Sequence, residues 1–258
     1  MEKVVNVGTF TVENNGNWEN HRKVSQGSSD WHFLRENSIG SSEAAAVFPS
    51  GISKTVEPYQ LKRKLLGQPT VVTAFMQNLF DIGAQMEPVL RKELMQLTGC
   101  PIIETGVFTK LGAGNLLESI KFNASLDGVL IDSTPESNYL CITEFKYRAG
   151  GGQDCGWAKE PSGLRQYLGV TVWCQVQHQM WVSGIHSAMV YSGSPDGCRR
   201  LWHVQYSEKY IDYWLQYAVR FFEEYMSTPN ARFTGGEKQR VLTRLEEFMD
   251  DTVVEIKL

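Results

Sequence analysis

Apolar and polar residues follow two different spacings along the chain, and the change between them predicts where helices give way to strands. Apolar residues three and four positions apart predict helices over residues 57–66, 74–98, 164–182, 208–226 and 238–249. Alternating or β-branched stretches predict strands over residues 102–109, 121–131, 140–147, 188–192 and 201–206. Helices that precede, interrupt and follow a set of strands predict an α/β protein, with a mixed central sheet flanked by helices.

The pattern also predicts how the chain divides. Residues 13–30 are rich in Asn, Gly and Ser, so we assign residues 1–30 to an N-terminal extension or linker. The β-forming residues of positions 1–12 could add an edge strand. A single folded domain covers residues 31–228, and residues 229–258 form a charged helical tail. A length of 258 residues fits one large domain with such additions.

Composition narrows the class of protein. The chain has 25 Lys and Arg against 29 Asp and Glu, a formal charge of −4, which excludes binding to polyanions by bulk charge alone. Its five cysteines never occur as C-x-x-C, which argues against a disulfide framework, a zinc ribbon and an iron–sulfur cluster. The sequence contains no apolar stretch of about 18 residues, and its N-terminus lacks the apolar core of a signal peptide. We therefore expect a soluble, intracellular protein with no membrane partner.

Two motifs at predicted strands carry candidate chemistry. Asp127 lies within one strand, and Glu144-Phe145-Lys146 lies within the next. Side chains alternate along a strand, so Glu144 and Lys146 project from one face while Phe145 packs on the other. Because charges are rarely left unpaired in a core, we consider that Asp127 and Glu144 bind Mg²⁺ while Lys146 orients an attacking water. The alternative is a surface ion pair beside a plain turn.

A third carboxylate lies in the long predicted helix. Glu87 follows Gly83 by four positions, so the two share a helix face, and the small glycine lets a ligand approach beside the acid. Pro88 disfavours helical geometry at Glu87 and predicts a kink or a restart of the helix there. The alternative is a solvent-facing glutamate beside a tolerated proline.

Two polar clusters complete the candidate set. Arg35 ends a short predicted helix, and Ser42 lies at the hydroxyl-capped start of the next. An arginine beside exposed N–H groups can bind an anion, although a surface arginine near a capping serine is the plainer interpretation. Gln175 and Gln179 share one face of the helix predicted over 164–182. We expect His178, beside them, to be a hydrogen-bonded residue rather than a ligand.

Taken in order, these motifs resemble one family. The set W-H-x-L-R with S-S-E, G-x-x-x-E-P, N-A-S-L-D-G, E-F-K and Q-V-Q-H-Q-M-W-V lies between Trp31 and about Tyr225. It resembles the lambda exonuclease / YqaJ-type viral recombinase family, part of the PD-(D/E)xK nuclease group. Each motif is weak alone, but five in the correct order make the resemblance specific. It implies a restriction-endonuclease-like core.

The resemblance implies a deoxyribonuclease: a Mg²⁺-dependent 5′-to-3′ exonuclease on duplex DNA, for which Mn²⁺ can substitute. Its product is a 3′ single-stranded tail for viral or phage DNA recombination and genome processing. By position, Asp127 and Glu144 are implied as the principal metal ligands, with Glu87 at a second metal position. Lys146 is implied as the catalytic lysine, and Gln175 as the glutamine that supports the reacting groups.

Three further residues are implied to contact DNA. Arg35 and Ser42 align with residues that receive the terminal 5′-phosphate, and Ser125 aligns with a serine near the metal and the phosphate. Enzymes of this family often form a homotrimer ring around DNA and pass their product to a single-strand annealing protein. The compartment implied is the bacterial cytoplasm, or the nucleus or cytoplasm of a host.

The sequence departs from the family pattern in several places. Residues 133–138 look like an insertion, Tyr147-Arg148 stands where the lambda-type pattern has Cys-Pro, and residues 150–152 are three glycines. These differences concern the ring and the entry of DNA more than the metal chemistry. Two alternatives stay open, namely a DNA endonuclease on the same metal core and a catalytically silent DNA-end-binding protein. The complete set of three acids and a lysine argues against the silent protein.

Overall fold

The computed structural model describes residues 18–53, 55–68, 72–112, 117, 120–132, 140–149, 168–227 and 235–258. Its strands are β1 (His21–Arg22), β2 (Ser38–Gly40), β3 (Ile102–Ile103), β4 (Gly106–Leu111), β5 (Lys121–Leu126), β6 (Gly128–Ile131), β7 (Leu140–Tyr147), β8 (Ser187–Gly193), β9 (Arg199–Gln205) and β10 (Val253–Ile256). Its α-helices are α1 (Ser29–Arg35), α2 (Pro58–Leu65), α3 (Ala74–Thr98), α4 (Val170–Ser183), α5 (Glu208–Arg220) and α6 (Gly235–Thr252). Shorter turns are the 3-10 helices η1 (Trp18–Asn20) and η2 (Ser41–Val47) and the π-helical turn η3 (Phe221–Met226).

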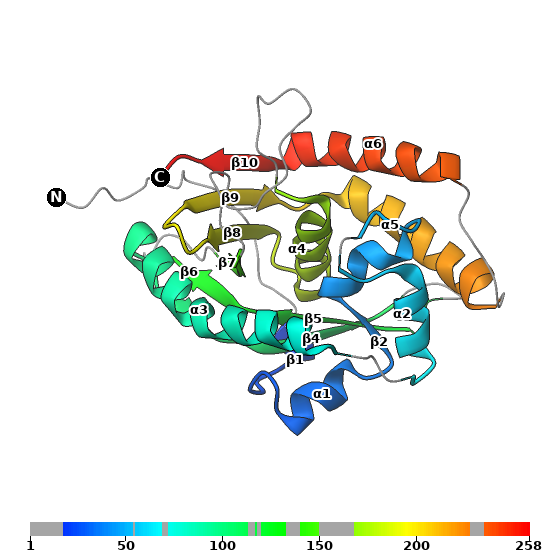
Figure 1. The fold of residues 1–258 in the computed structure, drawn as a ribbon, viewed down its shortest axis with the longest axis horizontal. Coiled ribbons are helices and arrows are strands. Elements are labelled where there is room, and N and C mark those ends of the chain that lie inside the picture. Colours follow the sequence, from blue (N-terminus) through cyan, green and yellow to red (C-terminus); the bar gives the residue numbers. More distant parts are fainter. Residues whose placement is uncertain are drawn as a thin grey trace.

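The strands form two mixed sheets (Figure 1). One has six strands in the order β10-β9-β8-β7-β6-β3, and the other has four in the order β1-β4-β5-β2. In the six-stranded sheet β7 pairs with β8 in parallel, and in the four-stranded sheet β2 pairs with β5 in parallel. The remaining neighbours are antiparallel. The predicted class, an α/β protein with a mixed sheet flanked by helices, is confirmed, although the strands divide between two sheets.

Helices pack on both faces of the six-stranded sheet. Helix α3 runs along the lower left of the molecule in Figure 1, and its residues Leu90 and Leu94 join Phe145 of β7 in a small core. Burial of a leucine contributes about 1.5–3 kcal/mol, so these contacts hold the second half of α3 against the sheet. A larger core on the opposite face includes Ile142 of β7 and Trp173 of α4.

Strand β7 alternates as its sequence predicts. Cys141 and Phe145 pack in the core beneath α3, whereas Ile142 belongs to the larger core. Glu144 and Lys146 follow Ile142 at steps of two, and both contact Gln175 of α4. The two charged residues therefore share the α4 side of the sheet, opposite Phe145, as predicted.

Two of the predicted strands are each divided between the two sheets. The stretch 102–109 becomes β3 and β4, and the stretch 121–131 becomes β5 and β6. Gly106 begins β4 with a φ of 121°, and a Cβ there would lie 2.4 Å from the carbonyl oxygen of Arg22 in β1. That conformation and that close approach both require glycine. Asp127 alone separates β5 from β6, so the chain passes from one sheet to the other at this residue.

Most predicted helices are present, with one correction. Helix α3 has the predicted bounds, but it does not restart at Glu87 or Pro88. Pro88 is exposed, and the ion pair between Glu87 and Arg91 spans the same turn. The proline therefore removes one backbone hydrogen bond without ending the helix. Helix α4 is described from Val170, and residues 164–167 of its predicted span lie outside the described residues.

The C-terminal residues add to the six-stranded sheet. Helix α6 contains the predicted helix 238–249, and the residues after it form β10, which pairs antiparallel with β9. The divisions after residues 30 and 228 stay predictions, although β10 lies in the same sheet as the central strands. Three predicted features lie outside the described residues: the edge strand within residues 1–12, the insertion at 133–138 and the glycines at 150–152.

Two further expectations can be compared with the described part of the chain. No helix there is long and apolar enough to cross a membrane. Cys100, Cys141 and Cys174 are free thiols, whereas Cys198 is disulfide-bonded. The number and spacing of the cysteines argued against a disulfide framework, but they do not exclude this disulfide at Cys198.

Candidate active site

Glu144 lies in the middle of β7 with a side chain that is 2% exposed. Its Oε1 accepts hydrogen bonds from Lys146 Nζ at 2.5 Å and from the side-chain amide of Gln175 at 2.7 Å. Its Oε2 accepts from the side-chain amide of Gln179, also at 2.7 Å. A carboxylate removed from water needs such donors, and together they hold Glu144 in one orientation.

Lys146 is a fixed positive charge beside this carboxylate. Its ammonium donates a second hydrogen bond, to Oε1 of Gln175 at 3.1 Å. Burial disfavours the charged amine, but the carboxylates of Glu144 and Asp127 outweigh that effect and raise the pKa of Lys146 above its ordinary value. Lys146 is therefore protonated at neutral pH.

Asp127 reaches β7 from the crossing between the two sheets. Its Oδ2 accepts the backbone N–H of Phe145 at 2.8 Å. Burial raises the pKa of Asp127 well above its ordinary value, and the charges of Glu144 and Glu87 raise it further. Lys146 and the Phe145 N–H act in the opposite direction. The three acids therefore lie close enough to repel one another.

Glu87, on α3, lies near Asp127 and Glu144, and these three residues are called the acid cluster below. Its Oε1 accepts a hydrogen bond from Arg91 Nη2 at 2.6 Å, and the same nitrogen donates to the backbone oxygen of Asp127 at 2.8 Å. Burial raises the pKa of Glu87, as do the charges of Glu144 and Glu104, while Arg91 lowers it. Arg91 was not among the predicted site residues, although its position four residues after Glu87 predicts the ion pair.

The arrangement fits a hard divalent cation chemically. Among the described residues, no three Asp, Glu, His or Cys side chains stand in a geometry that binds a metal ion. Each acid instead faces a donor of the protein, such as Arg91 at Glu87 and the Phe145 N–H at Asp127. The oxygens are nevertheless of the type that Mg²⁺ prefers, and a cation would relieve the repulsion that raises the pKa of Asp127.

A second group of predicted residues meets at Trp31. The guanidinium carbon of Arg35 lies 4.1 Å from the centre of the Trp31 ring, and the Trp31 indole N–H donates to Ser125 Oγ at 3.0 Å. Burial lowers the pKa of Arg35, and the charge of Glu43 opposes that shift. The structure thus joins Arg35 to Ser125 through one tryptophan, while Ser42 is exposed at the start of η2.

The predicted hydroxyl cap next to Ser42 is wrong. Gly40 is the capping residue of η2, and its N–H donates to Glu43 Oε2 at 2.8 Å. Ser41 is buried instead, and its Oγ lies 2.9 Å from Nδ1 of His178, which confirms His178 as a hydrogen-bonded residue. The bond from the Gly40 N–H to Glu43 is one half of a capping box, and Gly40 has no side chain to make the other half.

Comparison with known proteins decides the family. A family model described as the YqaJ-like viral recombinase domain matches residues 30–186, more than half of the chain. The chain belongs to the YqaJ-like viral recombinase family. The matched range contains every residue that the sequence assigned to the site. Membership confirms the predicted family and the predicted enzyme class, a deoxyribonuclease.

Solved structures share the fold of this YqaJ-family chain. An alkaline exonuclease (LHK-Exo) from Laribacter hongkongensis superposes with a TM-score of 0.51 at 14% identity, over 87% of this chain and 97% of that one. The structure of LHK-Exo in complex with dAMP gives a TM-score of 0.50 at 15% identity, with the same coverage of 87% and 97%. At this identity the likeness shows the fold alone, and it agrees with the predicted restriction-endonuclease-like core. No curated protein matches the chain in sequence.

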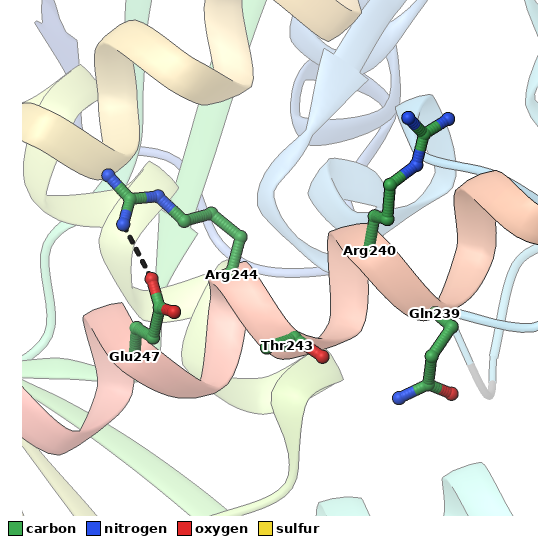
Figure 2. A pocket seen from close by; sticks show the side chains of 5 residues that line it. All are labelled: Gln239, Arg240, Thr243, Arg244 and Glu247. Atoms are coloured by element: carbon green, nitrogen blue, oxygen red, sulfur yellow. Dashed lines mark hydrogen bonds and ion pairs between the residues drawn. The ribbon is translucent and has the colours of Figure 1, made fainter.

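A hollow elsewhere on the YqaJ-family chain is not part of this site. It has a volume of about 440 Å³ and lies along α6 (Figure 2). Its lining residues are Gln239, Arg240, Thr243, Arg244 and Glu247. Arg244 and Glu247 pair with each other at 2.5 Å, and none of the five belongs to the acid cluster. The candidate active site is therefore the group of acids at β7 and not this hollow.

Proposed function

We propose that this YqaJ-family protein is a Mg²⁺-dependent exonuclease that digests one strand of duplex DNA from its 5′ end and leaves a 3′ single-stranded tail. The observation that carries the proposal is the position of Asp127. Its carboxylate accepts a hydrogen bond from the backbone N–H of Phe145, between Glu144 and Lys146 in β7. Arg91 donates both to the backbone oxygen of Asp127 and to the carboxylate of Glu87. Acids from three separate elements thus meet beside a protonated lysine.

Glu87, Asp127 and Glu144 are the residues we assign to Mg²⁺, with Mn²⁺ as a substitute. When bound, such a cation supplies charge compensation at the scissile phosphate. The acids offer it only oxygen donors, which suit both metals. The overall charge of −4 is compatible with a DNA substrate on this assignment, because the phosphate is neutralised locally.

Lys146 acts on the reacting groups directly in this proposal, and Gln175 supports them through Lys146 and Glu144. Because its pKa is raised, Lys146 donates hydrogen bonds to the attacking water or a phosphoryl oxygen and does not act as a base. Gln175 accepts a hydrogen bond from Lys146 and donates one to Glu144, so it fixes the direction of the ammonium.

Arg35, Ser42 and Ser125 are the residues we assign to the terminal 5′-phosphate. Arg35 is stacked on Trp31, which leaves its planar guanidinium pre-oriented for a phosphate. The negative charge of Glu43 acts on the Arg35 guanidinium and favours its charged form. A bound phosphate therefore competes with this carboxylate for the guanidinium. The competition makes the site selective for a doubly charged end over a neutral hydroxyl.

Digestion of labelled DNA tests the proposal. The full chain is incubated with linear duplex carrying a label at either the 5′ or the 3′ end, with or without a 5′-phosphate, in Mg²⁺ or in EDTA. We expect Mg²⁺-dependent release of the label from the 5′ end, and faster release when that end carries a phosphate. Covalently closed circles should not be nicked. Nicked circles would indicate an endonuclease, and binding to ends without cleavage would indicate a silent end-binding protein.

The assembly and the partner also remain proposals. The homotrimer ring and the single-strand annealing protein rest on the resemblance to the lambda exonuclease type. Light scattering on the purified protein measures the oligomeric state, and we expect a mass three times that of one chain. The intracellular location stays a prediction.

A further inference from the structure

Gln179 makes a contact that neither the motifs nor the family match assigns to it. It is fully buried in α4, and its side-chain N–H donates to Oε2 of Glu144 at 2.7 Å. Gln175, one turn earlier, donates to Oε1 of the same carboxylate at 2.7 Å. Residues four apart on a helix lie on one face, so this turn of α4 presents two amides to the two oxygens of one acid.

A neighbouring glutamine shows what a structural role looks like in the same helix. Gln177 is also fully buried, but its amide N–H donates to the backbone oxygen of Gln205 at 2.7 Å. Its Oε1 accepts the backbone N–H of Ser207 at 2.9 Å. Gln177 therefore joins α4 to the end of β9 and to Ser207, the residue that caps α5, and both ends of its amide are hydrogen-bonded.

Gln179 differs because only the donor end of its amide, the N–H group, makes a short hydrogen bond. Within the described residues its Oε1 is buried without a hydrogen-bond partner. An unsatisfied buried acceptor costs about 1–3 kcal/mol, and an apolar side chain of the same length would avoid that cost. The amide also lies 3.5 Å from the backbone oxygen of Ser125, which is too long for a strong bond. Its short contact with Glu144 is what the polar side chain provides at this position.

We propose that Gln179 is a positioning residue for the metal ligand Glu144. By holding Oε2 it prevents the carboxylate from rotating about its last torsion, and so keeps Oε1 beside Lys146 and Gln175. This inference rests on the proposed function, since it takes Glu144 as a ligand of Mg²⁺ or Mn²⁺. A residue that hydrogen-bonds to a metal-binding side chain raises metal affinity, because it holds that side chain in one orientation before the metal binds.

Binding of Mn²⁺ to the full chain tests the inference without relying on activity. We expect Gln179→Leu to weaken Mn²⁺ binding, measured by calorimetry or by the electron-spin signal of free Mn²⁺, by roughly 10- to 100-fold. Gln179→Met, which is closer in length, serves as a second variant if the leucine variant does not fold. Gln177→Leu is the matched control, and it should lower the melting temperature while it binds Mn²⁺ like the parent.

A second measurement separates positioning from direct chemistry. DNA digestion by Gln179→Leu should recover as the Mn²⁺ concentration is raised, whereas Lys146→Ala should stay inactive at every concentration. Parental Mn²⁺ affinity in both Gln179 variants would overturn the inference, as would equal losses in the Gln177 and Gln179 variants. If the parent chain itself binds no Mn²⁺, the proposed metal site fails, and the inference fails with it.

Discussion

Arg91 on α3 donates through Nη2 to Oε1 of Glu87 at 2.6 Å. The same nitrogen reaches the backbone oxygen of Asp127 at 2.8 Å, so one guanidinium links the helix to the crossing between the two sheets. The Arg91 side chain is 16% exposed, and it also pairs with Glu104. Arg91 therefore offsets part of the negative charge that the acid cluster gathers.

Replacing Arg91 by methionine should destabilise the fold. The change keeps most of the aliphatic stem but leaves Glu87 and the Asp127 carbonyl without this donor. We expect the free energy of unfolding to fall by about 1–3 kcal/mol, measured by urea titration in EDTA. Lys92→Met, at the exposed next position, is the control and should change it by no more than about 0.5 kcal/mol. Equal values for the two variants would show that Arg91 does not hold the cluster together.

Asp127→Asn should separate stability from activity. The asparagine keeps a side-chain oxygen that can accept the Phe145 N–H, but it removes a charge that Glu144 and Glu87 repel. The melting temperature without metal should therefore stay the same or rise, while DNA digestion in Mg²⁺ falls at least about a hundredfold. A variant that digests linear duplex at the parental rate would remove Asp127 from the catalytic set.

The elements that the sequence predicts correctly are those whose pattern is local. Helix α3 and strand β7 have the predicted bounds because each has one continuous pattern and clear turn residues at its end. The division of 121–131 at Asp127 could not be predicted in this way. Both halves are β-forming, and only their distant partners, β4 for one and β7 for the other, place them in different sheets.

The candidate site follows the same rule. The faces of Glu144 and Lys146 follow from strand alternation, and the ion pair of Glu87 with Arg91 follows from helical spacing. The contact of Gln179 with Glu144 depends on how α4 crosses β7, and that crossing is set by packing between residues far apart in the sequence. The link between Trp31 and Ser125 depends in the same way on the position of α1 beside β5.

Arg35→Ala should abolish the preference for phosphorylated 5′ ends. Without the guanidinium, a terminal phosphate loses its charged partner, whereas the acids at β7 are unchanged. We expect the ratio of digestion rates on 5′-phosphorylated and 5′-hydroxyl duplex to fall to about 1. Arg63→Ala, at an exposed position on α2, is the control and should keep the parental ratio. An unchanged ratio in Arg35→Ala would place the phosphate site elsewhere.

Two buried histidines should make the fold sensitive to acid. Burial lowers the pKa of His203 to about 4, and burial with the charge of Lys110 lowers that of His178 to about 3, from an ordinary value of 6.5. Below about pH 6.5 the unfolded chain binds protons that the folded protein does not. The free energy of unfolding is therefore highest above that pH, and it should fall by up to about 1.4 kcal/mol per pH unit for each histidine as the pH drops toward 4.

His203→Gln should reduce this acid sensitivity. Glutamine can still hydrogen-bond to Ser187, which His203 contacts at 2.8 Å, but it cannot take up a proton. The loss of unfolding free energy between pH 7 and pH 4.5, measured by urea titration, should be smaller than in the parent by about 2 kcal/mol. The comparison with the parent cancels the titration of carboxylates that the two proteins share. Parallel stability curves for the two proteins would mean that His203 becomes protonated within the folded protein, and that its burial does not exclude the charge.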